Sequence, residues 1–348
     1  MKKIGKGIGK FFIWLFVTII GIVAILAVVI NTIVHGPSAE AKNLFVKTML
    51  ETGQMKWVVG LFLDSDEVNA ILKQNSMGTF TAKVNLGGIE VGGGEGSEPF
   101  NPDEIKIEKI EGDNFSATMM IVNDPSRIFV GTTYPWGKYG QELDKIVNNY
   151  GATAGINGGL YYSAANEGGR PYGPVVSQGE IQNMSNLGMA GLVLIGMTED
   201  NKLDIIDIAG CGDADIRQII ADHRIRDAVT FQDEESDMDN HFVKLIINGE
   251  KRELNGMGSG ANPRTAIGQT KDGRMLLLVT TGRGANGQLG ATASDLIEIM
   301  ADYGAVNAAN LDGGSSTSMY YNGEWLQKSV TFYYATSSWR LPDAVLVR

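Results

Sequence analysis

The feature that most constrains this chain is a long apolar run without a single charge, from Phe11 to Val34. About 20 such residues are enough to cross the hydrocarbon core of a bilayer as a helix. Only a helix satisfies the backbone hydrogen bonds of one spanning segment internally. We therefore predict a transmembrane anchor over residues 11–34, with the lipid bilayer as its partner.

The residues that flank this run predict its orientation. Four lysines precede it, namely Lys2, Lys3, Lys6 and Lys10, and no lysine or arginine follows it before Lys42. The positive-inside rule then makes residues 1–10 a cytoplasmic basic tail and places the chain from His35 onward outside the cell. The alternative is a cleaved signal peptide, because Ala39-Glu40-Ala41 has the form of a cleavage site. The apolar run exceeds the roughly 7–15 residues of a signal h-region, so we favour a retained, single-pass anchor.

Three segments are expected after the anchor. Residues 38–86 have a helical pattern, with Leu44, Phe45 and Met49 on one face, and we predict a helical stalk there. Residues 87–103 are crowded with glycine and end in prolines, which is typical of a linker or surface hairpin. We place the domain boundary in this linker, and residues 104–348 then form the main domain.

The main domain is predicted to be of α/β class, with a mixed sheet, hairpins and a βαβ unit. The chain is 43% hydrophobic and holds 45 glycines, which suits many short elements joined by tight turns around a core. Strand-like runs occur at Ile105–Ile110, Phe115–Val122 and Arg127–Thr133. Farther on, the strand Met275–Thr281, the helix Ala293–Tyr303 and a strand from Ala305 make the βαβ unit.

Charge and cysteine content exclude several classes of protein. The formal net charge is −11, so nucleic acid is not expected as a partner. Cys211 is the only cysteine, so the chain can form no intrachain disulfide and no cysteine-rich metal site. A lone cysteine is most often a small buried thiol, and we do not take Cys211 as a nucleophile.

The stretch Asn310–Thr317 is the first candidate site. A strand of small and apolar residues ends in Asn310-Leu311-Asp312, which puts a carboxylate at a strand end. Gly313 and Gly314 allow close approach of a ligand or a positive φ, and the hydroxyls of Ser315, Ser316 and Thr317 follow. This combination suits an anionic or polyol ligand. The alternative is a tight turn in which Asp312 only bonds its neighbours.

A similar arrangement follows an earlier strand, Ala152–Ile156. It ends in Asn157-Gly158-Gly159, before side chains that can line a pocket. An Asn-Gly pair is also the commonest hairpin turn, so a purely structural role remains the alternative.

Two arginines supply candidate anion ligands. Arg264 follows Pro263 and precedes Thr265 at the start of a β-prone run, and its planar fork suits phosphate or carboxylate. Arg283 lies in a glycine-rich loop that matches GxGxxG, but the next helix begins only after Thr292, so we discount a dinucleotide site. The βαβ unit is expected to set the Arg283 loop beside the Asp312 turn.

Several other chemistries are excluded or demoted. The only histidines are His35, His223 and His241, and the serines lack a GxSxG elbow, so a Ser/His/Asp enzyme is not favoured and a histidine-rich zinc site cannot form. We expect His223 and His241 at the surface. The acidic run from Asp233 to Asp239 could hold calcium, but its spacing misses the EF-hand pattern. We predict no metal and no cofactor.

Five motifs, taken in order, resemble the phosphodiester glycosidase family: NGGLYY, NPRTAIG, TTGR, GATASDL and NLDGGSSTSMYYNG. The resemblance covers about Ile105 to Arg348. It implies hydrolysis of a sugar phosphodiester, as in the mammalian member that removes N-acetylglucosamine from its phosphodiester with mannose. Bacterial members are often called exopolysaccharide biosynthesis proteins, which implies a glycan or glycopolymer of the cell envelope as partner.

The resemblance also implies which residues form the site. The catalytic set is Asp312, Arg264, Arg283 and Asn157. The substrate-binding set is Gly158, Gly159, Asn310, Gly313, Gly314, Ser315, Ser316, Thr265, Asp295 and Arg340. Asp295 stands where the family usually has a glutamate, and Arg340, in the closing motif, is expected to brace the site. The stretch between Phe231 and Phe242 departs from the shorter family segment, so we expect a different substrate rim.

The chemistry of the leaving group indicates a mechanism. Cleaving the anomeric C–O bond of a sugar-1-phosphodiester releases a stable phosphate monoester, so positive charge around the phosphate matters more than general-acid help. Asp312 is then a base, a nucleophile or a stabiliser of the oxocarbenium-like transition state. A noncatalytic glycan- or phosphate-binding module and a phosphodiesterase that cleaves the P–O bond remain the competing hypotheses.

Overall fold

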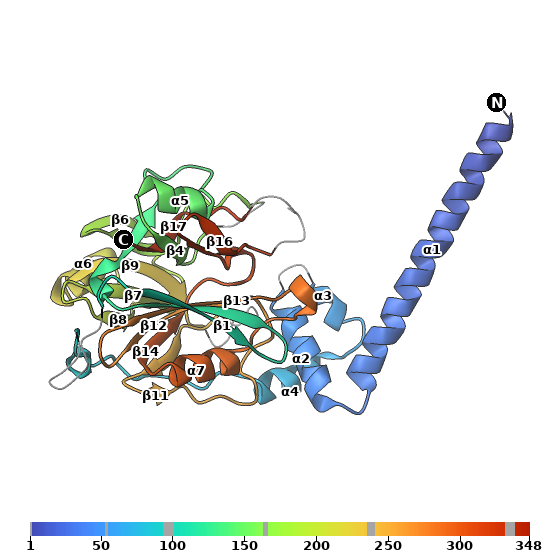
Figure 1. Ribbon diagram of the computed structural model, residues 1–348. Helices are drawn as coiled ribbons and strands as arrows, with labels where there is room; N and C mark the ends of the chain where they lie inside the picture. Colours follow the sequence, from blue (N-terminus) through green and yellow to red (C-terminus); the bar gives the residue numbers. More distant parts are fainter. Residues whose placement is uncertain (1, 53–54, 93–100, 163–165, 235–240, 331–337) are drawn as a thin grey trace. The chain divides into compact units, whose positions relative to one another are not determined.

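The computed structural model describes residues 2–52, 55–92, 101–162, 166–234, 241–330 and 338–348 (Figure 1). Glu235, Asp237 and Asp239 of the acidic run lie outside these residues, so the calcium alternative is not tested there. The chain divides into two compact units, Met1–Asn75 and Ser76–Arg348.

The first unit is helical. It contains α1 (Lys2–His35), α2 (Ala39–Leu50), α3 (Lys56–Val59) and α4 (Ser65–Gln74). Ser38 caps α2 by accepting a hydrogen bond from the N–H of Ala41, and Asp64 caps α4 in the same way through Glu67. Apolar side chains from all four helices share one small core, which includes Val34, Val46, Val59 and Ile71. These cap residues explain why α2 and α4 begin where they do.

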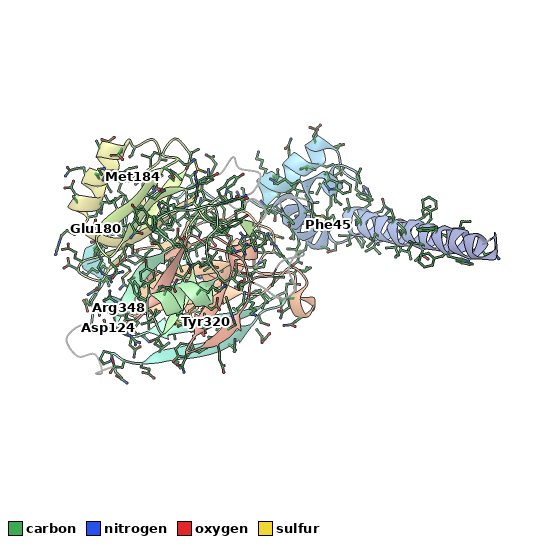
Figure 2. The ribbon with its side chains drawn as sticks, turned by 90° about the horizontal axis from the view of Figure 1, so that it is seen from above. Phe45, Asp124, Glu180, Met184, Tyr320 and Arg348 are labelled. Atoms are coloured by element: carbon green, nitrogen blue, oxygen red, sulfur yellow. The ribbon has the colours of Figure 1, made fainter. Side chains whose placement is uncertain are left out.

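The helix α1 contains the predicted anchor. Its segment Gly9–His35 is long and apolar enough to cross a membrane, judged by length and composition. Large apolar side chains stand exposed all along it, Trp14 at 69% for example, and Figure 2 shows them projecting on every side of the helix. A helix that is apolar all round requires an apolar environment.

The second unit begins at Ser76, earlier than the glycine-rich segment where the sequence placed the boundary. Helix α4 ends at Gln74, and the predicted stalk therefore stops short of residue 86. The N–H of Gly78 bonds the carbonyl of Glu253 at 2.9 Å, and that of Glu90 bonds Lys271 at 2.8 Å. These long-range bonds tie residues 76–92 into the second unit, because the extended backbone there finds hydrogen-bond partners on Glu253 and Lys271.

A seven-stranded sheet forms the centre of the second unit (Figure 1). Its order is β1 (Ile105–Glu111), β2 (Ser116–Val122), β13 (Met275–Thr280), β12 (Thr265–Thr270), β14 (Ala305–Asn310), β10 (Lys244–Ile247) and β11 (Glu250–Lys251). The strands at its middle are buried along their whole length, whereas β1 alternates between half-buried and exposed residues as an edge strand does. Helix α7 (Ala293–Asp302) covers one face with Leu296, Met300 and their neighbours.

The predicted βαβ unit differs from the structure in one respect. Strands β13 and β14 are parallel to each other, since each is antiparallel to β12. However, β12 lies between them, so the two strands are not neighbours. The strand β12 of the β12–β13 hairpin lies there because its backbone pairs with β13 on one edge and with β14 on the other.

Two five-stranded sheets complete the second unit. One has the order β16 (Glu324–Gln327), β15 (Met319–Tyr321), β4 (Ala154–Asn157), β17 (Asp343–Val347) and β3 (Ile128–Thr132). The other has the order β6 (Glu180–Ser185), β5 (Gly173–Ser177), β9 (Ile225–Gln232), β7 (Leu192–Thr198) and β8 (Leu203–Asp207). Helix α5 (Leu143–Asn149) contacts the first of these sheets, and α6 (Asp213–Asp222) contacts β9 of the second.

The largest core joins residues of all three sheets, among them Ile156, Val229 and Leu277. The chain end after β17 is also fixed, since Nε of Arg127 donates to the carbonyl of Arg348 at 2.8 Å. Figure 2 shows Arg348 close to Asp124, the residue that precedes the turn Pro125–Arg127. Packing of separate sheets on one core brings the end of β4 to the end of β14. The predicted mixed helix-and-sheet class is thus confirmed, with antiparallel neighbours throughout the described strands.

Candidate active site

The ends of β4 and β14 meet at Asn157. This side chain is fully buried, and its Nδ2 donates to the main-chain carbonyl of Asp312 at 2.6 Å. Its Oδ1 accepts from Oγ1 of Thr265 at 2.7 Å and from the N–H of Ser318 at 3.2 Å. Asn157 therefore joins β4, the first residue of β12 and the turn after β14. Its polar atoms face protein groups, which gives it a positioning role.

The carboxyl group of Asp312 lies in the turn that follows. Its Oδ1 accepts the N–H of Gly313 at 2.9 Å, and the main chain is held by Gly314 N–H bonding the carbonyl of Pro263 at 2.8 Å. Burial raises the pKa of Asp312 to about 6, although the Ser316 hydroxyl, His241, Gly313 and Arg283 each act to lower it. His241 was expected at the surface, but it is half-buried. Its effect on the pKa of Asp312 shows that it interacts electrostatically with the site. A carboxylate with this pKa can take up or release a proton near neutral pH.

Arg283 brings positive charge to the same turn. It occupies the left-handed region at φ 55°, and its Nη1 donates to Oγ of Ser315 at 2.6 Å. Gly314 makes room for it, because a Cβ on Gly314 would lie 2.6 Å from Nη2 of Arg283. Its Nε is buried without a hydrogen-bond partner among the described residues. A guanidinium with an unused donor beside a glycine turn is suited to an anionic ligand.

Arg264 adds a second, buried positive charge to this region. Arg264 is 8% exposed, and its Nη2 donates to the carbonyl of Gly260 at 2.9 Å and to Oγ of Ser259 at 3.1 Å. The guanidinium stacks on the Phe242 ring at 5.0 Å. Burial lowers the pKa of Arg283, Asp312 opposes this shift, and the charge of Arg264 adds to it. The two cations are therefore electrostatically coupled.

Sequence reasoning missed a second carboxyl group, that of Asp343 at the start of β17. Asp343 is 1% exposed; its Oδ1 accepts the N–H of Gly159 at 2.8 Å, and its Oδ2 is buried with no partner among the described residues. Burial, opposed by the Gly159 hydrogen bond and assisted by the charge of Asp312, raises the pKa of Asp343 to about 7. The missed signal was an acidic residue that opens a wholly apolar strand.

Tyr161 completes the cluster. Its hydroxyl lies 2.7 Å from Oγ of Ser316, the residue that also bonds Asp312. Burial raises the pKa of Tyr161 well above its usual value, and both Asp312 and Asp343 act in the same direction. The structure thus groups two carboxyls, a phenol and two guanidiniums around one turn.

The predicted glycines face protein groups. A Cβ on Gly158 would lie 2.0 Å from Oδ1 of Asp343, one on Gly159 would lie 2.4 Å from the carbonyl of Thr230, and one on Gly313 would lie 2.9 Å from that of Pro263. These three positions therefore allow segments of the protein to approach closely. Gly158 in particular leaves the space in which the Asp343 carboxyl sits.

Three other predicted residues, Asn310, Asp295 and Arg340, bond groups outside this cluster. Asn310 donates from Nδ2 to the carbonyl of Phe242 at 2.9 Å, with its Oδ1 buried and unpartnered among the described residues. Asp295 forms the capping box of α7, accepting from the N–H and the Oγ1 of Thr292, both at 2.7 Å. Arg340 is held by Asn166 at 2.7 Å and lies over the Tyr139 ring at 5.4 Å. Helix capping accounts for Asp295 by itself.

His223 and Asp233, two residues considered in the sequence analysis, have structural partners. His223 pairs with Asp204 at 2.7 Å, and Asp233 pairs with Arg252 at 2.7 Å. Within the described ranges, no group of three or more His, Cys, Asp or Glu side chains could hold a metal ion.

A family model described as phosphodiester glycosidase matches residues 150–348, more than half of the chain. Among solved structures, the zebrafish N-acetylglucosamine-1-phosphodiester α-N-acetylglucosaminidase catalytic domain, auto-inhibited by its pro-peptide, aligns with a TM-score of 0.52 at 20% identity. That alignment covers 74% of this chain and 86% of the other. A hypothetical protein from Synechocystis aligns with a TM-score of 0.42 at 20% identity, covering 70% of this chain and 62% of the other. No curated protein gives a significant match.

Proposed function

This chain belongs to the phosphodiester glycosidase family, and on that premise we propose that it hydrolyses the anomeric C–O bond of a sugar-1-phosphodiester. The substrate class is an N-acetylglucosamine type of glycosyl phosphodiester in a cell-envelope polymer or exopolysaccharide. The observation that carries the proposal is the turn at Asp312, where a carboxyl group with a pKa of about 6 interacts electrostatically with the guanidinium of Arg283.

The arginines suit the phosphate. The unused Nε of Arg283 and the coupled charge of Arg264 favour an anion at the glycine turn, and stabilise the phosphate monoester as it leaves. The C1–O bond breaks with its electron pair on the phosphate oxygen, which needs no added proton because the monoester is a stable anion. Water supplies the new oxygen at C1 and gives up a proton.

The carboxyl pair suits the sugar. Asp312 acts in its ionised form whether it takes the proton of water, attacks C1 or stabilises the positive charge that develops there. The negative charge of ionised Asp312 raises the pKa of Asp343, so the pair favours one ionised and one protonated carboxyl. One negative charge is then kept at the site in place of two.

The test is hydrolysis in ¹⁸O-labelled water by the full chain in detergent, with methyl N-acetylglucosamine-1-phosphodiester as substrate and mass spectrometry of the products. We expect the label in the free sugar, which means C–O cleavage. Label in the phosphate would replace the proposal with a phosphodiesterase that cleaves P–O. A folded chain that binds the substrate but releases no product would favour a glycan-binding module.

We further propose that α1 anchors the protein in the cell membrane, with the N-terminus in the cytoplasm and the second unit outside. The apolar segment Gly9–His35 and the lysines before it support this. Protease added to intact expressing cells should digest the second unit but leave an epitope tag at the N-terminus intact. Release of a chain that begins near Ala41 into the medium would show a cleaved signal peptide.

A further inference from the structure

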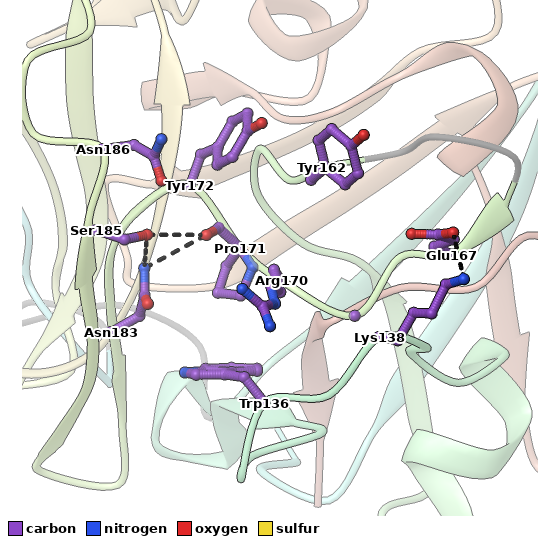
Figure 3. Close-up of a pocket in the computed structure, with 11 residues that line it drawn as sticks. Trp136, Lys138, Tyr162, Glu167, Arg170, Pro171, Tyr172, Asn183, Ser185 and Asn186 are labelled. Atoms are coloured by element: carbon purple, nitrogen blue, oxygen red, sulfur yellow. Dashed lines mark hydrogen bonds and ion pairs between the residues drawn. The ribbon is translucent and has the colours of Figure 1, made fainter.

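A pocket of about 650 Å³ opens on the second unit, lined by residues that the proposed reaction does not use (Figure 3). Three of its lining residues are aromatic. Figure 3 shows Trp136 on one side of the pocket, Tyr162 and Tyr172 on the other, and Arg170 between them.

The aromatic walls are held in place by protein contacts. Nε1 of Trp136 donates to the carbonyl of Gln182 at 2.9 Å, and the rings of Tyr162 and Tyr172 are 6.4 Å apart. Nδ2 of Asn183 bonds the carbonyl of Gly173 at 2.6 Å, which fixes the strand beneath Tyr172. A pocket with walls fixed in this way is formed before a ligand arrives.

The charge of the pocket favours an anion. Lys138 and Glu167 neutralise each other across 3.2 Å, while Arg170 is exposed and has no ion pair with any described residue. One guanidinium charge is thus left among aromatic faces. Flat rings stack on the apolar faces of sugars, and a guanidinium forks onto phosphate, so together they suit a phosphorylated sugar.

The chain connects this pocket directly to the candidate active site. Gly159 bonds Asp343, the hydroxyl of Tyr161 meets Ser316, and Tyr162 then lines the pocket with its N–H on the carbonyl of Arg170. Three residue steps span at most about 11 Å, so Gly159 and Tyr162 cannot be farther apart. The pocket therefore lies within the length of a short glycan chain from the candidate active site.

We propose that the pocket lined by Trp136, Tyr162, Tyr172 and Arg170 is a second saccharide subsite, which binds a further sugar-phosphate unit of a polymeric substrate. This inference rests on the proposed function, because it assumes that the polymer is a chain of sugar-1-phosphate repeats. The subsite makes the protein select polymer over a single phosphodiester.

The test separates binding from turnover. The full chain carrying Asp312→Asn is titrated in detergent with a tetramer of N-acetylglucosamine-1-phosphate units. Isothermal calorimetry measures the dissociation constant. Adding Trp136→Ala or Arg170→Ala should each weaken binding by about tenfold or more. The controls are Trp57→Ala and Arg217→Ala, since Trp57 and Arg217 are exposed and lie outside the pocket. They should leave the affinity unchanged.

In the chain with Asp312 intact, Arg170→Ala should raise KM for the tetramer about tenfold more than it raises KM for the methyl phosphodiester. No binding of the tetramer, equal losses in pocket and control variants, or equal rises in the two KM values would each overturn the subsite. The titration does not depend on hydrolysis. If the proposed reaction fails, the chain with Asp312 intact binds the tetramer but does not cleave it. If the subsite proposal fails, the pocket variants bind the tetramer as tightly as the Asp312→Asn chain does.

Discussion

Nδ2 of Asn157 donates to the main-chain carbonyl of Asp312 at 2.6 Å, across 155 residues of sequence. Asn157 ends β4 in one sheet and Asp312 follows β14 in another, so this bond joins two sheets at the candidate active site. The two strand ends that resemble each other in sequence therefore meet in space. The position of the Asp312 carboxyl depends on this contact.

We expect Asn157→Ala to destabilise the second unit by about 3 kcal/mol, because it leaves the Thr265 hydroxyl, the Ser318 N–H and the Asp312 carbonyl without a buried partner. Urea unfolding measures this loss. Asn149→Ala is the control, since Asn149 makes an exposed bond to Gln141. A loss no larger than that of the control would contradict the structural role of Asn157.

The catalytic role of Asp312 predicts that Asp312→Asn lowers kcat by about 10²–10⁴-fold while the fold is retained. The amide keeps the size of the carboxyl but cannot carry its negative charge. Asp302→Asn, at the exposed end of α7, is the matched control and should keep full activity. Full activity in Asp312→Asn would remove Asp312 from the mechanism.

The pKa of Asp312 predicts the pH dependence of the rate. All three roles require its ionised form, so kcat/KM should rise as the pH rises through about 6 and fall by about tenfold per unit well below it. Initial rates between pH 4.5 and 8 test this. A profile that stays flat between pH 5 and 7 would mean that another group controls the reaction.

Asp343 predicts how stability depends on pH. Its pKa is raised from 3.8 to about 7 in the folded state, so the folded protein binds a proton that the unfolded chain has already released. The stability contribution of that proton is complete below about pH 4 and is lost as the pH rises through about 7. We expect Tm to fall between pH 5 and 8, and to fall less in Asp343→Asn.

The control for this slope is Asp302→Asn, an exposed aspartate in the same unit. It should keep the slope of the unchanged protein. Equal slopes in the Asp343→Asn and unchanged proteins would show that the Asp343 carboxyl is not the proton-binding group.

Gly314→Ala should reduce activity through Arg283. The new Cβ would lie 2.6 Å from Nη2, so the guanidinium must move away from the turn. Gly304→Ala shares the unfavourable positive φ, 77° against 62°, but meets no atom within 4 Å. Both variants should lose about 1–3 kcal/mol of stability from backbone strain.

Only Gly314→Ala is expected to lower kcat/KM, by about tenfold, which steady-state kinetics with the methyl phosphodiester would measure. Equal activity in the two variants would mean that the place of Arg283 beside Gly314 is not needed.

The sequence by itself determined the local elements of this protein. Alternation and apolar runs predicted β1, β2 and β3 to within a residue or two, and Thr292 correctly marked the start of α7. These features depend on neighbours along the chain, so periodicity and capping residues are sufficient to find them. The motifs around Asp312 and Arg283 were also recognisable, since glycine and charge at a strand end are local signals.

Only the tertiary structure decided which of those residues act together. In the folded protein β12 lies between β13 and β14, and Asp343 and Tyr161 interact electrostatically with Asp312. Asp295 caps helix α7. The structure also showed that Gly158 makes room for the Asp343 carboxyl. Such contacts join segments far apart in sequence, and they arise because three sheets bury their apolar faces on one shared core. No local pattern contains that information, since the partner of a buried polar group is chosen by packing.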